Sequence, residues 1–143
     1  MAVSRFVRRA EKNRGVTERL YRSMKEGRDA EPEVGRSARM LGVRPGIDIL
    51  VDPDGTVTGG AGGMSVAPDS PANLPAHRRP PEHGGTGKDP VWEIRTVDLE
   101  EGLAYREDPL QLGVHGFVEP SRRITLEDYE RALRATRTAW RLL

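Results

Sequence analysis

The sequence has no cysteine, and aromatic residues make up only 5% of its 143 positions. The absence of cysteine excludes disulfides and thiolate metal sites, and it is typical of a compartment in which thiols stay reduced. The histidines His77, His83 and His115 do not have the spacing of a zinc site, so no metal is expected. No apolar run approaches the length of a membrane span, and the first residues lack the apolar segment of a secretory signal. We therefore expect a cytoplasmic protein without a classical signal peptide, or one delivered into a target cell by a specialised route.

Large apolar residues are scarce, whereas residues that favour turns are abundant. Hydrophobic residues account for 36% of the chain, which also contains 16 glycines and 11 prolines. A chain of this length usually forms one domain, and this composition indicates a small core with long irregular connections. We therefore expect residues 1–143 to form a single domain.

The net charge is only +1, but the charges are separated along the chain. Residues 1–28 carry nine Lys and Arg side chains against three acidic ones, whereas residues 29–118 carry eight against fifteen. A basic N-terminal region is suited to binding a phosphate-rich or acidic partner, or to forming the solvated face of a helix. Its only aromatic residues are Phe6 and Tyr21, which argues against a surface for single-stranded nucleic acid.

The residue pattern predicts short strands between two terminal helices. Apolar and β-branched residues alternate or cluster at seven places where strands are expected: residues 16–24, 47–51, 56–58, 64–67, 91–97, 103–106 and 113–119. The turn sequence at residues 52–55 predicts a hairpin between the second and third of these. Helices are expected at residues 3–13 and from the cap Thr125 to Leu143. The pattern indicates an α+β fold with a small mixed, mainly antiparallel sheet.

A long connection with almost no large apolar residues lies at residues 68–90. Connections of this length are typically functional lids or disordered segments, and composition does not distinguish the two. Within it, residues 83–88 read His-Gly-Gly-Thr-Gly-Lys, which is similar to a phosphate-binding loop. Glu82 occupies the position of the first glycine and Pro90 follows closely, so we exclude a nucleoside triphosphatase.

Three short motifs supply the residues of a candidate ligand site. They are Leu20-Tyr21-Arg22 on the first expected strand, Gly62-Gly63-Met64-Ser65 at the entry to a middle strand, and His115 with Phe117 and Glu119 on a late strand. Glycine permits positive φ and close approach of the backbone to a ligand, so the glycine cluster is expected to form the floor of a cleft. Each residue also has an ordinary structural explanation: an ion pair for Arg22, a turn hydroxyl for Ser65 and partial burial for His115.

In the order and spacing of these motifs, the chain resembles the small ADP-ribosyltransferase-like toxins that bacteria deliver by type VI secretion. Those toxins have a comparable Leu-Tyr-Arg near the start and a Gly-Gly-x-Ser-Val entry to a middle strand. A late strand bears a histidine and is followed by proline and an apolar C-terminal helix. The resemblance implies a small split sheet that grips nicotinamide adenine dinucleotide (NAD) in a cleft. The chain departs from the transferase pattern in one respect, because no Glu-x-Glu pair occurs in the matching region.

The resemblance also implies which residues bind NAD and cleave its bond to nicotinamide. Such a site needs a cation for the diphosphate, hydrogen bonds to ribose, and a group that stabilises positive charge or moves a proton. The residues implied for NAD binding are Tyr21, Arg22, Gly63, Ser65, His115 and Phe117, with Arg22 on the diphosphate and the two aromatic rings as stacking partners. The residues implied for catalysis are Ser65, His115 and Glu119.

We therefore expect a bacterial toxin-like enzyme that uses NAD to ADP-ribosylate an unknown protein or nucleic acid, or that hydrolyses NAD. An immunity or antitoxin protein is the partner that this function implies. Two alternatives stay open at the level of sequence. One is a non-catalytic module whose basic N-terminal helix binds a partner protein or RNA, and the other is a related transferase that acts on a phosphorylated RNA end.

Overall fold

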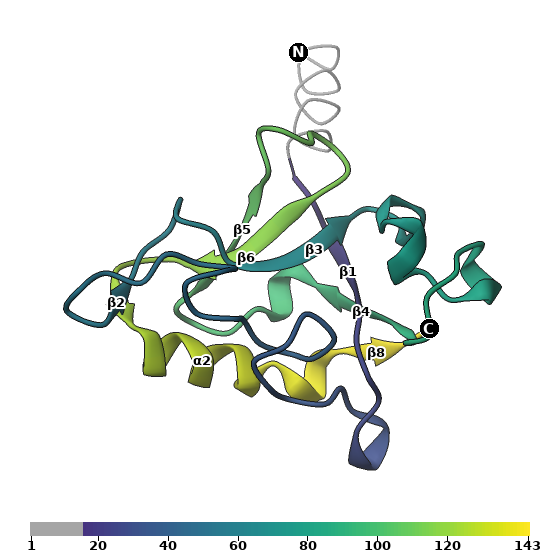
Figure 1. Cartoon of the computed structure of the whole chain (residues 1–143), viewed down its shortest axis with the longest axis horizontal. Helices are drawn as coiled ribbons and strands as arrows, with labels where there is room; N and C mark the ends of the chain where they lie inside the picture. The colour runs from purple at the N-terminus through teal and green to yellow at the C-terminus, as the bar shows by residue number, and fades with distance from the viewer. Residues whose placement is uncertain (1–15) are drawn as a thin grey trace, which may run out of the picture.

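The computed structural model describes residues 16–143, which form a six-stranded sheet packed against one α-helix (Figure 1). The strand order is β5-β6-β3-β1-β4-β8, and each neighbouring pair runs antiparallel. The strands are β1 (Arg19–Ser23), β3 (Met64–Pro68), β4 (Val91–Arg95), β5 (Leu103–Glu107), β6 (Gly116–Pro120) and β8 (Arg141–Leu142). The predicted α+β class and mainly antiparallel sheet are confirmed. The N-terminal helix predicted at residues 3–13 lies outside the described residues.

The sheet consists of two halves that meet between β1 and β3. β1 pairs with β4 at five positions, and β5 pairs with β6 at five. β1 and β3 pair at only two positions, Leu20 with Pro68 and Tyr21 with Ala67. The N-terminal part of β3 pairs with β6 instead. The half-sheets β5-β6-β3 and β1-β4-β8 are therefore joined by a ladder that ends at Tyr21.

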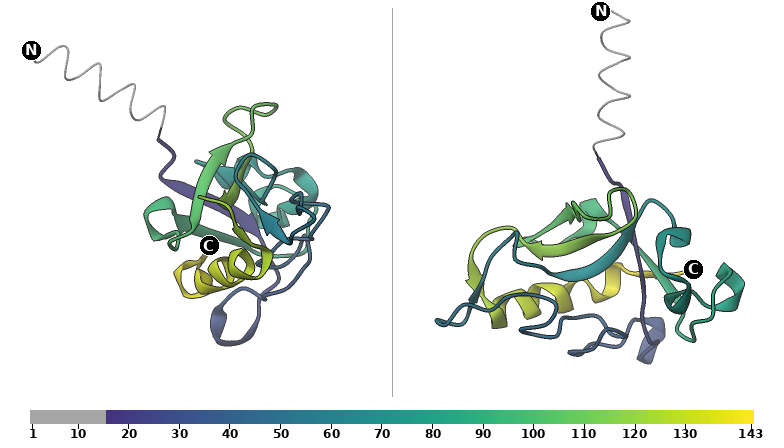
Figure 2. Two further views of the ribbon diagram at one scale, coloured as in Figure 1. Left: turned by 90° about the vertical axis from the view of Figure 1, so that its left-hand side faces the viewer. Right: turned by 45° about the horizontal axis from the view of Figure 1, so that its top comes forward.

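The helix α2 (Leu126–Ala135) lies along one side of the sheet (Figures 1 and 2). The Thr125 hydroxyl caps it by accepting a hydrogen bond from the Asp128 N–H at 3.1 Å, as the sequence predicts. Tyr129 and Leu133 are buried in a core with Leu20, Met24, Leu41, Ile49, Met64, Val66, Trp92, Ile94, Val118 and Trp140. Burial of each large apolar side chain contributes about 1.5–3 kcal/mol. No helix within residues 16–143 is long and apolar enough to cross a membrane.

The hydroxyl of Tyr129 connects the helix to two strands of one half-sheet. It donates a hydrogen bond to the Val118 carbonyl at 2.6 Å and accepts one from the Met64 N–H at 3.2 Å. Burial raises the pKa of Tyr129, so the hydroxyl stays protonated. Because Tyr129→Phe removes the partner of both backbone groups, we expect it to lower the free energy of unfolding by about 1–3 kcal/mol, as measured by urea denaturation.

Tyr105→Phe is the matched control for this prediction. The buried Tyr105 hydroxyl has no hydrogen-bond partner within residues 16–143. Its removal is therefore expected to leave the free energy of unfolding unchanged or to raise it. Equal losses of stability in the two variants would contradict the role assigned to the Tyr129 hydroxyl.

The C-terminal helix is shorter than predicted and is followed by a strand. It ends before Thr136, whose hydroxyl donates to the Leu133 carbonyl at 2.7 Å and accepts a hydrogen bond from the Trp140 indole at 3.0 Å. This turn directs Trp140 into the core, and the chain then pairs with β4 as the edge strand β8. The apolar residues between 126 and 143 are spaced as in a helix because one side of this segment is buried, first in α2 and then in the turn after it. Periodicity alone does not distinguish a helix from a helix followed by such a turn.

The hairpin predicted at residues 47–58 is wrong. The turn within it forms, with the Gly55 N–H donating to the Asp52 carbonyl at 2.8 Å, but the first of its two segments is not a strand. The second segment forms β2 (Thr56–Val57), which pairs with β7 (Ile124–Thr125). Here Val57 is completely buried beside the start of α2. The turn residues at 52–55 do not indicate that β2 pairs with β7, because β7 lies far along the chain.

The long connection at residues 68–90 folds into three 3₁₀ turns, Pro71–Asn73, Ala76–Arg78 and Pro81–His83. The Ser70 hydroxyl caps the first turn by accepting a hydrogen bond from the Ala72 N–H. The Asn73 amide then donates to the Pro68 carbonyl at 2.8 Å, which fixes this turn to the end of β3. The first two turns form one wall of a cleft beside β1 and β3.

Candidate functional site

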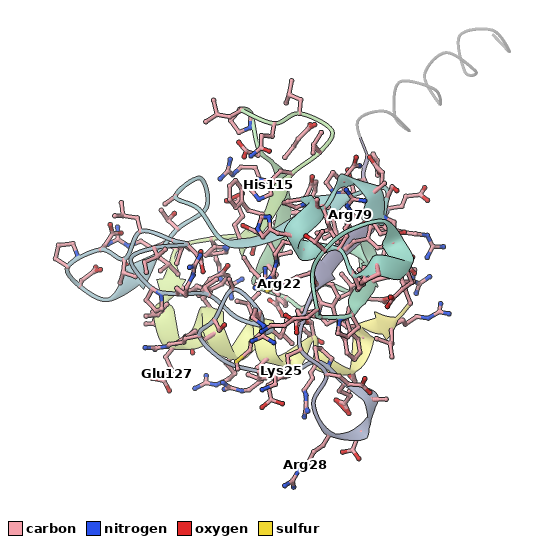
Figure 3. The ribbon with its side chains drawn as sticks, turned by 45° about the vertical axis from the view of Figure 1, so that its right-hand side comes forward. Arg22, Lys25, Arg28, Arg79, His115 and Glu127 are labelled. Carbon is pink, nitrogen blue, oxygen red and sulfur yellow. The ribbon has the colours of Figure 1, made fainter. Side chains whose placement is uncertain are left out.

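A cleft of about 560 Å³ lies where β1 and β3 stop pairing. It is lined by Arg22 from β1, Ser65 from β3 and His115 from the segment before β6, together with residues 72–76, Arg78 and Arg79 of the turns. Figure 3 shows Arg22, Arg79 and His115 around this part of the molecule. One residue from each of the three sequence motifs thus reaches the same cleft.

Arg22 is almost fully buried, with 5% of its surface exposed. Its Nη1 donates to the Ser65 carbonyl at 2.7 Å, while Nη2 and Nε donate to the Met40 carbonyl at 2.8 and 3.2 Å. Burial, followed by repulsion from Arg78, lowers the pKa of Arg22 to about 10, so the guanidinium stays charged at neutral pH. Arg22 therefore bridges the half-sheets beyond the end of their ladder and brings a positive charge to the cleft.

Two further arginines, Arg78 and Arg79, line the cleft from the turns. Arg78 donates to the Ser23 carbonyl at 2.8 Å and Arg79 to the Leu74 carbonyl at 2.9 Å, and each has a second carbonyl partner. Within residues 16–143, neither of them nor Arg22 forms an ion pair with a carboxylate. Carbonyl groups orient these side chains without cancelling their charge, so the cleft favours an anion.

A fourth arginine in the cleft is neutralised. The Arg44 Nη2 lies 2.8 Å from Oδ1 of Asp48. Although burial raises the pKa of Asp48, hydrogen bonds from Arg44 outweigh it and hold the pKa below its usual value. The pair is therefore ionised and adds no net charge to the cleft.

His115 is oriented by a carboxylate. Its Nδ1 lies 2.8 Å from Oδ2 of Asp108, and the Asp108 N–H donates to the His115 carbonyl at 3.0 Å. The hydrogen bond from His115, followed by one from the Leu110 N–H, lowers the pKa of Asp108. The carboxylate is thus ionised at neutral pH and suited to accept a hydrogen bond from Nδ1–H, and with Nδ1 as the donor, Nε2 is left to act as an acceptor or base. Because folding lowers the pKa of Asp108, the stability this pair contributes is present above the ordinary Asp pKa of about 3.9 and is lost as the pH falls through the lowered value.

Ser65 lies on the same face of its half-sheet as His115. It pairs in register with Phe117, and directly opposed residues of an antiparallel pair project to one face. The Phe117 ring packs edge-on against the His115 ring with a centroid distance of 4.9 Å. The exposed Ser65 side chain lines the cleft, so its hydroxyl is accessible to a ligand there.

Glu119, the predicted catalytic carboxylate, does not line the cleft. Its carboxylate pairs with the Arg106 guanidinium at 3.0 Å and accepts a hydrogen bond from the Gly60 N–H. Arg106 also lies over the Phe117 ring, 4.9 Å from its centroid. Phe117 and Glu119 therefore project to the same face of β6, as predicted. Glu119 is four residues beyond His115, about 13 Å along the strand, and there it stabilises the glycine segment and β5.

Three residues predicted to bind the ligand, Tyr21, Gly63 and Phe117, also lie outside the cleft lining. The Tyr21 hydroxyl donates to Glu93 at 2.8 Å on the other face of β1. Gly63 has a φ of 154°, and a Cβ there would lie 2.8 Å from the Val118 carbonyl oxygen. Glycine is therefore required for β3 to approach β6, and the glycine cluster does not form the floor of the cleft.

Three residues of the site were not predicted from the sequence: Arg78, Arg79 and Asp108. Asp108 had a recognisable signal, because it lies just after the predicted strand 103–106 and His115 lies near the start of the next one, 113–119. Adjacent strands joined by a short connection usually pair, which brings the two ends of the connection together. Arg78 and Arg79 had no such signal, since they belong to a segment without predicted structure.

No protein-family model, curated protein or solved structure matches this chain. The function is therefore inferred from the chemistry of the cleft and from the resemblance of the three sequence motifs.

Proposed function

We propose that the cleft binds NAD as a substrate and that the protein transfers its ADP-ribose to an acceptor or to water. The observation that carries this proposal is that Arg22, Ser65 and His115 line one cleft whose unpaired arginines favour an anion. The two half-sheets on either side of the cleft support an ADP-ribosyltransferase-like fold. In this proposal the protein is a toxin-like bacterial enzyme.

The arginines suit the diphosphate of NAD. Guanidinium groups match phosphate oxygens in geometry and stay charged at all physiological pH values. Most donors of Arg22 are already engaged with backbone carbonyls, so Arg22 acts mainly through its charge. Arg78 and Arg79 reach the cleft from surface turns and are assigned to direct contact with the diphosphate.

His115 suits the transfer of a proton during capture of the ribose. When the bond from ribose to nicotinamide breaks, its electron pair leaves with nicotinamide and the ribosyl carbon becomes cation-like. A hydroxyl or water oxygen then bonds to that carbon, and Nε2 of His115 accepts the proton it loses. The ionised Asp108 stabilises the resulting imidazolium, and Ser65 is assigned a hydrogen bond to ribose.

Isothermal titration of the full chain with NAD, followed by an assay of nicotinamide release, tests this proposal. We expect binding that weakens as salt is added, because the diphosphate contacts are ionic, and measurable release of nicotinamide. Arg28→Ala removes an exposed charge remote from His115 and Arg79 in Figure 3 and is expected to change neither result. The absence of both NAD binding and nicotinamide release would contradict the proposal.

Asp108→Asn is expected to slow nicotinamide release by about a hundredfold while NAD affinity stays within about twofold. The amide oxygen can still accept the hydrogen bond from the Leu110 N–H, so the loop is preserved. The neutral amide does not stabilise an imidazolium on His115. Asp98→Asn, at an exposed ion pair, is the matched control. Weaker NAD binding at an unchanged rate would assign Asp108 to substrate binding instead.

The binding module considered from the sequence depends on residues 3–13, which lie outside the described residues. The identity of the acceptor and an immunity or antitoxin partner stay predictions from the resemblance. Of these functions, the cleft favours the NAD reaction, because the cleft has the size of a nucleotide and places arginines that attract an anion beside His115.

A further inference from the structure

A second pocket of about 240 Å³ adjoins the cleft through Ser23 and Arg78, which line both. Its other lining residues are Arg39, His77, Thr86, Gly87, Lys88 and Asp89. We propose that this pocket binds a phosphate monoester on the adenosine end of the dinucleotide, so that the preferred substrate is the 2′-phosphorylated form of NAD, NADP. The inference rests on the proposed function, because the remainder of the dinucleotide occupies the cleft.

Residues 86–88, the end of the glycine-rich segment 83–88, form one wall of the pocket. The backbone N–H groups of residues 83–87 donate to carbonyls of the same connection, as in the hydrogen bond of 2.9 Å from the Thr86 N–H to the Ala76 carbonyl. A Cβ at Gly85 would clash with the backbone carbonyls of Ala76 and Arg79, so glycine is needed for this close packing. The segment therefore does not enclose a phosphate with its backbone, and it presents the side chains of Thr86 and Lys88 to the pocket instead.

The carboxylate in the pocket does not oppose an anion. Arg39 binds Asp89 in a bidentate arrangement, with Nε 2.6 Å from Oδ2 and Nη2 2.8 Å from Oδ1, and this hydrogen bonding lowers the pKa of Asp89. Lys88 is exposed and forms no ion pair with any carboxylate in the described part of the chain. Lys88 and Arg78 therefore give the pocket an excess of positive charge.

The charge balance of the two pockets indicates a third phosphate. Together they are lined by six cationic side chains and two carboxylates, a difference of four charges. The cations are Arg22, Arg39, Arg44, Arg78, Arg79 and Lys88, and the carboxylates are those of Asp48 and Asp89. The NAD diphosphate matches two of these charges, and a phosphate monoester adds about 1.5–2 negative charges at neutral pH. Because oxidised nicotinamide itself carries one positive charge, NADP leaves about one of the four charges unmatched, whereas NAD leaves about three.

The second pocket adjoins the end of the cleft that suits adenosine. His115 and Ser65 line the cleft alone, whereas Arg78 lines both cavities. With the reacting ribose at His115 and the diphosphate at the arginines, the adenosine half extends past Arg78. A 2′-phosphate on that half then meets Thr86 and Lys88.

Isothermal titration of the full chain with adenosine 2′,5′-bisphosphate and adenosine 5′-monophosphate tests the second site without nicotinamide. We expect the bisphosphate to bind at least about tenfold more tightly, because its additional phosphate gains charged hydrogen bonds. Lys88→Ala is expected to remove most of this difference. It truncates an exposed side chain, so the fold is preserved. Arg28→Ala removes an equal charge elsewhere and should keep the difference.

The outcomes separate this inference from the proposed reaction. Equal binding of the two nucleotides, binding of neither, or a preference that survives Lys88→Ala combined with Thr86→Ala would overturn the second phosphate site. None of these results bears on nicotinamide release from NAD. A bisphosphate preference that depends on Lys88 supports the site even if the protein releases no nicotinamide. Titration with NADP and NAD should then show the same preference of at least about tenfold.

Discussion

His115→Ala is expected to slow nicotinamide release from NAD by about a hundredfold or more, the usual contribution of a positioned base. The variant loses the only histidine that lines the cleft, and with it the proton acceptor held by Asp108. The side chain is 25% exposed just before the start of β6 and is not part of the buried core, so its removal leaves the core intact. Nicotinamide release at saturating NAD measures the effect on the chemical step.

His83→Ala is the matched control, because this histidine lies in the turn Pro81–His83 and does not line the cleft. We expect its rate to stay within about twofold of the unaltered protein, since the positioned base is untouched. An undiminished rate in His115→Ala would refute the assignment of the base. Equal losses in the two variants would indicate a general loss of folded protein, which thermal unfolding of the same samples detects.

Arg22→Lys is expected to lower the free energy of unfolding by about 2–4 kcal/mol although the charge is kept. The planar guanidinium reaches the Ser65 and Met40 carbonyls on opposite sides, and a single ammonium group does not reproduce this fork. In the variant, at least one of these two carbonyls loses its hydrogen-bond donor, and the buried lysine ammonium has fewer hydrogen-bond partners than the guanidinium had. Urea denaturation measures the loss.

Arg19→Lys supplies the matched control on the same strand. Arg19 is 48% exposed and pairs with Glu93 at 3.0 Å, a contact that lysine can also make. Exposed ion pairs contribute little, so we expect a change below about 1 kcal/mol. If both substitutions cost the same, Arg22 does not bridge the half-sheets in the way described.

Local patterns were sufficient to predict the strands that carry the site. Alternation with a period of two located β1, β3 and β6 to within a few residues of their observed bounds. The same alternation put His115 and Phe117 on one face, where their rings now pack together. The cap at Thr125 likewise fixed the start of α2. These features depend on neighbours in the sequence, which is why the sequence reveals them.

Partners that are distant in the sequence were not predicted. The pairing of β2 with β7 and of β8 with β4 depends on which surfaces stay open after the core has packed. Glu119 is a similar case, because its strand face was predicted but its partner Arg106 was not. An ion pair with Arg106 engages a carboxylate that the sequence alone leaves available for catalysis.

A cluster of glycines is required in either of two situations: a ligand lies against the backbone, or another part of the chain does. Glycine is needed where another group comes within contact distance of the backbone, and the sequence reveals this need. In this fold the approaching group is the chain itself: a Cβ at Gly62 would clash with the Asp48 carbonyl, and one at Gly63 would crowd Val118. The polar residue after the cluster, Ser65, still reaches the cleft.

Under the proposed function, the bridge that Arg22 makes between the half-sheets limits how the ligand specificity of this protein can evolve. A substitution of Arg22 alters ligand affinity and the joining of the two halves together, so selection cannot adjust one without the other. Arg78, Arg79 and Lys88 lie on surface turns, where a change of side chain leaves the core intact. If the proposed function holds, we expect related proteins with other ligands to differ in residues 71–88 and to retain arginine at position 22.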